Sequence, residues 1–240
     1  ATAADRRSFS GGSDAEYYKN AVVQKKALIA KLNKVNYDKV ASNENVEVLD
    51  GLASFKDEHT VQVTNGSEVS EVYAERIFVN TGARPFIPSV PGLEVGRRIH
   101  TSETLMDLEE FPKSLAILGS GFIGLEFAAS YAKFGTKVTI IDQGDKILPR
   151  EDEDVAKEVF ASYQGLGVDF LFGAALQQVS QDEDAVHLSY TVNGEKKELS
   201  VEAFLVATGR QANTEELHLE NAGVEVSERG FIKVNEHLQS

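Results

Sequence analysis

The first part of the chain changes its hydrophobic period once. Apolar residues recur three and four positions apart after Ser13 and Glu16, which have the spacing of a capping box, and this pattern predicts a helix. Those apolar residues are Tyr18, Ala21, Val22, Leu28, Ile29 and Leu32. From residue 46 to residue 88, short apolar runs alternate with turn residues, which predicts a β-meander. The segment 81–92 then carries three of the five prolines and predicts a stiff, extended linker.

After Pro112 the pattern alternates between strand and helix. The run LAILG at 115–119 predicts a buried strand, and a glycine-rich turn follows it. Residues 122–134 predict a helix, with Gly135 at the position where a left-handed residue ends a helix. The run KVTIID at 137–142 predicts a second strand. The sequence therefore predicts a βαβ unit here.

The pattern continues with one more helix and strand before it returns to a meander. The acidic run EDED at 151–154 favours the start of a helix, because carboxylates stabilise the positive end of the helix dipole. The run VDFLF at 168–172 predicts a strand. In the meander, Asn193 and Gly194 stand between two alternating runs and predict a primed hairpin turn. The last strong strand is AFLVATG at 203–209.

The turn after the first strand of the βαβ unit carries the main chemical signal. It has the pattern GxGxxG, formed by Gly119, Ser120, Gly121, Phe122, Ile123 and Gly124. Because this pattern leaves a strand and opens a helix, its glycines can make the turn, admit a pyrophosphate and let helix and strand pack closely. Asp142 ends the second strand, where a carboxylate can accept hydrogen bonds from the adenosine ribose. We therefore predict a dinucleotide site.

Asp142 also predicts which dinucleotide binds. A carboxylate there repels the 2′-phosphate of NADP, and no arginine follows it directly, so NAD is preferred over NADP. Lys146 is a nearby cation that would weaken this preference if it faced the ligand instead of solvent. A glycine-rich turn with no ligand, or with another phosphate ligand, remains the alternative interpretation of the motif.

Composition removes several other classes of protein. The chain has 240 residues, 42% of them hydrophobic, and a formal net charge of -14, which disfavours nucleic acid and anionic membranes as partners. It has no cysteine, so these 240 residues contain no disulfide, thiolate metal site or thiol redox centre. The apolar stretch 115–127 is interrupted by glycines and Glu126, which argues against a membrane span. With no secretory pattern at its start, we expect a cytoplasmic protein, and we assign no metal site.

Three segments, 101–142, 148–158 and 204–217, together resemble the pyridine nucleotide-disulfide oxidoreductases, the FAD-dependent group that contains dihydrolipoamide dehydrogenase, glutathione reductase and mercuric reductase. The resemblance implies an α/β fold class: a Rossmann-like NAD-binding domain, made of a βαβ sheet and a β-meander, with part of an FAD-binding domain. It implies that the chain, which opens on Ala1 and not on Met, is a middle piece of a longer parent. Three regions are expected: a partial FAD-binding domain (1–108), an NAD-binding domain (109–230) and a return strand to the FAD domain (231–240).

The resemblance also implies roles for residues outside the glycine motif. Phe122 would cover the nicotinamide pocket, although core packing explains an apolar residue there equally well, and Glu126 would face the flavin. Because Glu126 interrupts the apolar run IGLEFAA, we expect it to be buried and to need a partner, which the family supplies from a segment absent here. Leu176 would line the adenine site, and Gly209 would approach the nicotinamide ribose. Near the FAD adenosine the resemblance implies Ala53, Thr81 and Gly82, for which a structural role in turns is the alternative.

Several family features are missing from these residues. The FAD-binding GxGxxG, the redox Cys-x4-Cys pair, the second FAD motif and the carboxy-terminal dimerisation domain with its catalytic His-Glu pair all fall outside the sequence, so no catalytic residue is assigned. The five histidines have polar neighbours, so we expect them on the surface without a role: His59, His100, His187, His218 and His237.

Two hypotheses follow for function. In the first, the chain is the NAD(H)-binding portion of a flavoprotein that passes hydride from NADH to FAD and on to a disulfide or related small-molecule acceptor, the full-length parent being a homodimer. In the second, it is an NAD-binding module or truncated core with no catalytic activity of its own.

Overall fold

The computed structural model describes residues 14–109 and 111–240, so the predicted cap Ser13 lies outside the described residues. The chain divides into two compact units. The first comprises Ala1–Leu28 and Pro85–Gly209, and the second comprises Ile29–Arg84 and Arg210–Ser240. The helix α2 (Asp14–Ala41), the element predicted at the start of the chain, contributes residues to both units.

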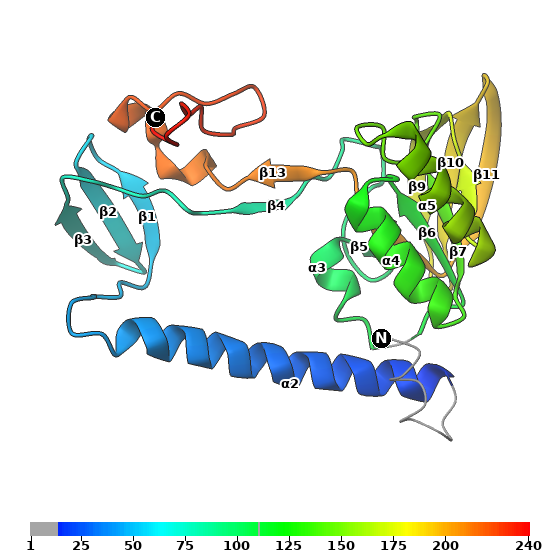
Figure 1. Cartoon of the computed structure of the whole chain (residues 1–240), viewed down its shortest axis with the longest axis horizontal. Coiled ribbons are helices and arrows are strands. Elements are labelled where there is room, and N and C mark those ends of the chain that lie inside the picture. Colours follow the sequence, from blue (N-terminus) through cyan, green and yellow to red (C-terminus); the bar gives the residue numbers. More distant parts are fainter. Residues whose placement is uncertain (1–13, 110) are drawn as a thin grey trace. The chain divides into compact units, whose positions relative to one another are not determined.

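A five-stranded parallel sheet forms the centre of the first unit (Figure 1). Its strands run in the order β5 (Ile99–His100), β12 (Ala203–Val206), β6 (Ser114–Leu118), β7 (Lys137–Ile141) and β8 (Asp169–Leu171). The strand β6 pairs with β7 on one side and with β12 on the other, although β12 comes much later in the chain. The strand order therefore reverses beside β6, which is where ligands bind in open α/β sheets.

One face of this sheet is covered by helices. Its helices are α4 (Phe122–Lys133), α5 (Glu153–Gly165), the short α3 (Ser102–Leu105) and the first part of α2. A single apolar cluster joins helix and sheet residues and includes Tyr18, Leu115, Ile117, Leu125, Ala128, Tyr131, Val138, Ile140, Ala156 and Leu205. Alternate residues of β6 and β7 thus pack against helices on this face.

The opposite face is covered by an antiparallel meander of three strands (Figure 1). It consists of β9 (Ala174–Gln181), β10 (Val186–Val192) and β11 (Glu195–Val201), in the order β11-β10-β9. Asn193 and Gly194 both have positive φ, 52° and 81°, as the predicted primed turn requires. A second cluster joins the two sheets and includes Ile99, Ala116, Leu118, Ile141, Leu176, Val179, Leu188, Phe204 and Val206.

Burial on both faces explains the continuous apolar runs seen in the sequence. Leu115, Ala116 and Ile117 are all fully buried, although successive side chains of a strand point to opposite faces. The predicted βαβ unit, the following helix and strand, and the meander are therefore confirmed.

The second unit is smaller and has little buried apolar surface. Three antiparallel strands form its sheet, in the order β1 (Leu52–Phe55), β2 (Thr60–Asn65) and β3 (Glu68–Tyr73), which confirms the predicted meander. The strands β4 (Ala83–Pro85) and β13 (Arg210–Ala212) pair as a ribbon, and two short 3-10 helices follow, η1 (Glu215–Leu217) and η2 (Leu219–Ala222). Its buried apolar residues are Phe55, Leu217 and Leu219.

None of the described helices is both long and apolar enough to pass through a bilayer.

Candidate dinucleotide site

The glycine turn sits at the carboxyl end of β6, and two of its glycines are required by backbone packing. Gly119 has φ of +108°, and a Cβ added there would lie 2.5 Å from the carbonyl oxygen of Ala207. A Cβ added to Gly124 would lie 2.1 Å from the carbonyl oxygen of Gly119. Both positions therefore exclude a side chain, as the motif predicts for the tight turn and for close helix–strand packing.

Gly121 differs from the other two glycines of the motif. A Cβ added there would have no atom of the described residues within 4 Å, so the protein leaves open space at this position. Gly121 is also the N-cap of α4, which has no side-chain hydrogen bond at its cap and no acidic residue in its first turn. The free N–H groups and the positive end of this helix thus face open space, and this arrangement suits a phosphate.

The carboxylate of Asp142 is hydrogen-bonded on both oxygens. Its Oδ2 accepts the backbone N–H of Ser120 at 2.7 Å and the Ser120 hydroxyl at 2.6 Å, and its Oδ1 accepts the N–H of Gly144 at 2.8 Å. The end of β7 is thereby joined to the glycine turn. Because a carboxylate offers about four acceptor positions, one is still available for a ribose hydroxyl.

These groups border a cavity of about 700 Å³ at the carboxyl ends of β6, β7 and β12. The volume is in the range of small-molecule and cofactor sites. The cavity is lined by Pro88, Val90, Leu118, Gly119, Ser120, Gly121, Phe122, Ile141, Asp142, Gln143, Gly144, Asp145, Lys146, Leu148, Pro149, Arg150, Glu151, Leu176, Ala207, Thr208 and Gly209. Acidic and basic side chains both contribute, with the cations on the loop that follows β7.

Most of the predicted NAD residues lie together at this cavity. Phe122 lines it with 63% of its surface exposed, so this aromatic side chain is not a core residue in the chain. Leu176 is buried in β9 and lines the same cavity, and Gly209, with φ of +134°, lines it after β12. Ile123 is half-buried and does not belong to the lining, and Gly124 acts through its contact with the turn.

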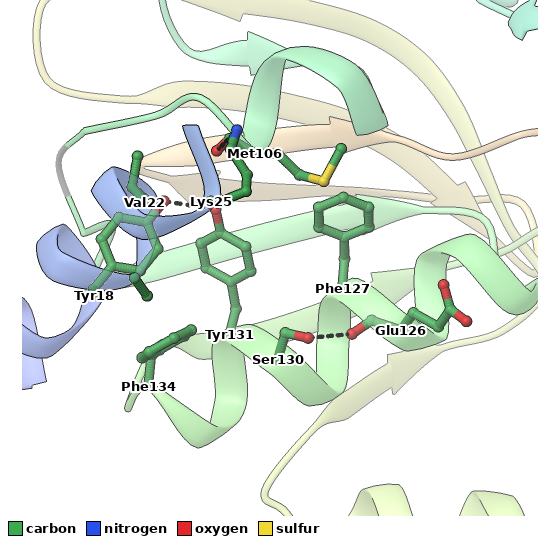
Figure 2. Close-up of a pocket in the computed structure, with 10 residues that line it drawn as sticks. Tyr18, Val22, Lys25, Met106, Glu126, Phe127, Ser130, Tyr131 and Phe134 are labelled. Atoms are coloured by element: carbon green, nitrogen blue, oxygen red, sulfur yellow. Dashed lines mark hydrogen bonds between the residues drawn. The ribbon is translucent and has the colours of Figure 1, made fainter. Parts of the chain in front are cut away.

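Glu126 borders a different cavity, of about 310 Å³, between α2 and α4 (Figure 2). Its carboxylate points away from the aromatic side chains that close this cavity, and the residue is exposed. The expectation that Glu126 is buried is therefore wrong for this chain. The apolar run IGLEFAA suggested that Glu126 is buried along with its neighbours. In the structure Leu125 and Ala128 face the sheet, while position 126 lies on the outer side of the helix.

Two tyrosines hold the first part of α2 against α4 beside this second cavity. The hydroxyl groups of Tyr18 and Tyr131 lie 2.9 Å apart, and each also lies within hydrogen-bond distance of a carbonyl oxygen, Tyr18 of Leu108 at 2.8 Å and Tyr131 of Leu105 at 3.1 Å. The two hydroxyl hydrogens are shared among these three contacts. Burial raises the pKa of both phenols, that of Tyr131 strongly. Phe134 packs edge-on against Tyr18, with ring centres 5.3 Å apart.

The three residues predicted for FAD belong to the second unit, whereas the dinucleotide cavity is lined by the first. Ala53 lies in β1 opposite Val63. The carbonyl oxygens of Thr81 and Gly82 accept hydrogen bonds from Asn213, at 3.0 Å and 3.1 Å. These hydrogen bonds hold the segment of Thr81 and Gly82 beside the end of β13, which is a structural role for both residues. In the part of the chain that is described, no group of three or more His, Cys, Asp or Glu side chains could hold a metal ion.

Three charged residues that line the cavity, Asp145, Arg150 and Glu151, were missed from the sequence, as was one buried histidine. Arg150 lies eight positions after Asp142, directly before the acidic run at 151–154. His100 was expected on the surface, but it is 5% exposed. It lies in the edge strand β5 and pairs with Leu205 of β12, which is distant in sequence, so its polar neighbours along the chain gave the wrong expectation.

The class of protein follows from comparison with known sequences. The chain matches the family model described as pyridine nucleotide-disulphide oxidoreductase over residues 4–240, and it belongs to that family. It is 38% identical over 220 residues to the probable pyridine nucleotide-disulfide oxidoreductase RclA of Escherichia coli, a match that covers 92% of this chain and 49% of RclA. It is 35% identical to the dihydrolipoyl dehydrogenase of Geobacillus stearothermophilus, covering 81% of this chain and 41% of that protein.

Solved structures agree with this assignment. The HOCl-induced flavoprotein disulfide reductase RclA from Escherichia coli matches with a TM-score of 0.82 and 36% identity, covering 92% of this chain and 50% of that one. Its Cu(II) complex matches with a TM-score of 0.86 and 37% identity, covering 94% and 51%. The predicted fold class, a Rossmann-like unit with part of an FAD-binding domain, is thereby confirmed. The chain spans about half the length of the relatives it matches.

Proposed function

We propose that the first unit binds NAD(H) in the 700 Å³ cavity, as part of a longer flavoprotein. The observation that carries the proposal is the open space at Gly121, at the uncapped N-terminus of α4. A pyrophosphate there would accept N–H groups of the first helical turn and gain from the helix dipole. Gly119 and Gly124 hold the turn in the shape that leaves these groups free.

We assign the two ends of the nucleotide from the family resemblance, among the residues that line the cavity. We assign the adenosine ribose to Asp142, whose remaining acceptor position can take a hydroxyl, and the adenine to the apolar surface at Leu176. Phe122 and Gly209 are assigned to the nicotinamide end. We propose NAD over NADP because the Asp142 carboxylate repels a 2′-phosphate, while Lys146 and Arg150 oppose this preference from the same cavity.

In the full-length parent we propose that the bound nicotinamide delivers hydride toward a flavin. FAD would supply the redox chemistry when bound, and the role of this chain is to position the nucleotide and exclude water around it. The division into a partial FAD domain (1–108), an NAD domain (109–230) and a return segment (231–240) is part of this proposal. So are the assignments of Glu126 to the flavin side and of Ala53, Thr81 and Gly82 to the FAD adenosine.

The final acceptor is proposed only as a class. The names of the relatives refer to different substrates: mercuric reductase of Lysinibacillus sphaericus, 32% identical over 91% of this chain, stands beside dihydrolipoyl dehydrogenase. We propose a disulfide or a related small redox molecule as the acceptor, a class broad enough to include the substrates in these names. We also propose that the full-length parent is a homodimer.

A second function applies to the 240 residues taken alone. Because they contain no cysteine, they hold no thiol that could pass electrons to a disulfide. We therefore propose that the isolated chain is an NAD-binding module without reductase activity.

The test is a titration of NADH, followed by its fluorescence, with the wild-type chain and two matched variants. Gly121→Val adds a side chain where the protein leaves space, so it should fold normally but weaken NADH binding by about tenfold or more. Gly96→Val is the control, because a Cβ at Gly96 also meets nothing within 4 Å and Gly96 does not line the cavity. Equal NADH affinities for all three proteins would refute the site.

A further inference from the structure

A third cavity lies at the opposite ends of the parallel strands from the dinucleotide site. It has a volume of about 250 Å³ and is lined by residues that include Arg97, Arg98, His100, Phe111, Pro112 and Glu202. The two arginines directly precede β5, Glu202 directly precedes β12, and Pro112 comes shortly before β6. Because these strands are parallel, the cavity lies at their amino ends.

The imidazole of His100 has an unmet hydrogen-bonding group. The residue is 5% exposed, and its Nε2 atom is buried without a hydrogen-bond partner among the described residues. Burial lowers the pKa of His100, so the ring is neutral at physiological pH. Buried polar atoms nearly always have partners, and one that lacks a partner calls for an explanation.

The contacts of His100 are compatible with a proton on Nε2. Its Nδ1 lies 3.5 Å from Oγ1 of Thr104, and that hydroxyl already accepts the N–H of Thr101 at 3.0 Å. We assign the tautomer in which the Thr104 hydroxyl donates to Nδ1 and the proton of the neutral ring is on Nε2. In this tautomer the unmet group is a donor, and its missing partner is an acceptor.

The charges at the cavity also favour an acceptor with negative charge. Arg98 donates through Nε and Nη2 to the carbonyl oxygen of Glu183 and through Nη1 to that of Glu202, the last at 3.0 Å, which leaves N–H groups of its guanidinium unused. Arg97 is exposed, and within the described part of the chain its guanidinium makes no hydrogen bond or ion pair. The Glu202 carboxylate opposes them, but it accepts the Lys113 N–H at 2.7 Å. Two guanidinium groups against one carboxylate make the lining positive, in a chain whose net charge is -14.

We propose that this cavity binds a small oxyanion, which accepts hydrogen bonds from the Nε2–H of His100 and from the guanidinium groups of Arg97 and Arg98. Guanidinium groups match the geometry of both carboxylates and phosphates. Phe111 and Pro112 supply apolar surface for a small organic part of the ligand. The site is separate from the dinucleotide cavity, so the inference does not depend on the proposed function.

The experiment observes the imidazole nitrogens of the 15N-labelled 240-residue chain by NMR, at fixed pH. Inorganic phosphate and benzoate are titrated in separate samples, and the signal lost in His100→Phe identifies His100. We expect a saturable shift of the His100 signal with at least one probe, and the probe that binds tells a phosphate from a carboxylate ligand. The four exposed histidines are internal references.

Two variants, each lacking one exposed arginine, test whether positive charge at the cavity contributes to anion binding. Arg97→Gln should weaken binding of the active probe by about tenfold, the loss expected for a charge-assisted hydrogen bond. Arg76→Gln removes the same charge from an exposed site in the other unit and should leave the affinity unchanged. The proposal is overturned if neither probe moves the His100 signal, if all five histidines shift alike, or if Arg97→Gln binds as tightly as the wild type.

Discussion

Asp142 accepts two hydrogen bonds from Ser120, one from its backbone N–H and one from its hydroxyl, at 2.7 Å and 2.6 Å. These bonds connect the end of β7 to the glycine turn after β6. Ser120 itself is only 2% exposed, so these hydrogen bonds are largely shielded from bulk water. The residue predicted to hold the ribose therefore also holds the turn predicted to hold the phosphates, and substitutions at either residue act on both.

We expect Ser120→Ala to lower the free energy of unfolding by about 2 kcal/mol, because it removes a buried hydrogen bond to a charged group. The backbone N–H bond to Asp142 remains, so the turn should survive. The measurement is urea unfolding. Ser130→Ala is a suitable control: its hydroxyl donates to the carbonyl oxygen of Glu126 at 2.8 Å from an exposed position, and its loss should cost less than about 0.5 kcal/mol.

Asp142→Arg should weaken NADH binding and improve NADPH binding relative to it, because the change replaces a charge that repels the 2′-phosphate by one that attracts it. Asp142→Asn separates the two roles of the residue, since the amide oxygen can still accept from Ser120 but the repulsion is gone. Direct titrations with both nucleotides measure the ratio. If the ratio of NADH to NADPH affinity stays the same in both variants, Asp142 does not face the ribose.

Gly124→Ala should destabilise the first unit by about 3 kcal/mol, because its Cβ would lie 2.1 Å from a backbone oxygen that cannot move without opening the turn. Alanine is the better helix former, so intrinsic propensity acts in the opposite direction. Gly121→Ala, three residues earlier in the same turn, should change stability by less than about 0.5 kcal/mol, because a Cβ at Gly121 meets nothing within 4 Å. Thermal unfolding of both variants checks the contrast, and equal effects would contradict it.

Stability should fall as the pH rises above about 10, and Tyr131 should contribute to the fall. Its folded-state pKa is raised by burial and by its contact with Tyr18, whereas the unfolded phenol titrates near 10. Above that pH the unfolded chain releases a proton that the folded chain retains, so the stabilisation is complete below pH 10 and is lost progressively above it.

Urea unfolding between pH 8 and pH 11.5 measures this slope. Tyr131→Phe should reduce the slope, at the expense of about 1 kcal/mol of stability at neutral pH from the lost hydrogen bonds. Tyr37→Phe is the control, since Tyr37 is exposed. A slope that is unchanged in Tyr131→Phe but reduced in Tyr37→Phe would contradict the role given to the buried pair.

The sequence predicted the parallel sheet well because burial on both faces leaves an unmistakable mark, such as the run from Leu115 to Leu118. The turn at Asn193 and Gly194 was equally predictable, since few residues accept positive φ. The glycine motif could be placed because its chemistry is local: strand, turn and helix are consecutive in the chain.

Two of the features that escaped prediction depend on segments that are distant in the sequence. Nothing near His100 in the sequence shows that β5 adds to the sheet beside β12, more than 100 residues later, and buries this side chain. Arg150 lines the cavity from the loop after β7, and the sequence pattern does not predict the path of that loop. Glu126 was expected to be buried because its neighbours are apolar, but it is exposed, since even a hydrophobic helix has an outer side.

The three glycines of the turn differ in whether the folded protein alone excludes a side chain. If this chain had no ligand, Gly119 and Gly124 would still be kept, because any side chain there strikes the backbone. Position 121 would be free to change, because the folded protein alone sets no limit on it. A glycine lowers stability by enlarging the conformational freedom of the unfolded chain, so its presence at 121 is a small, permanent disadvantage to folding. The proposed pyrophosphate site gives a reason for glycine at this position, since a phosphate would lie in the space that a side chain would otherwise fill.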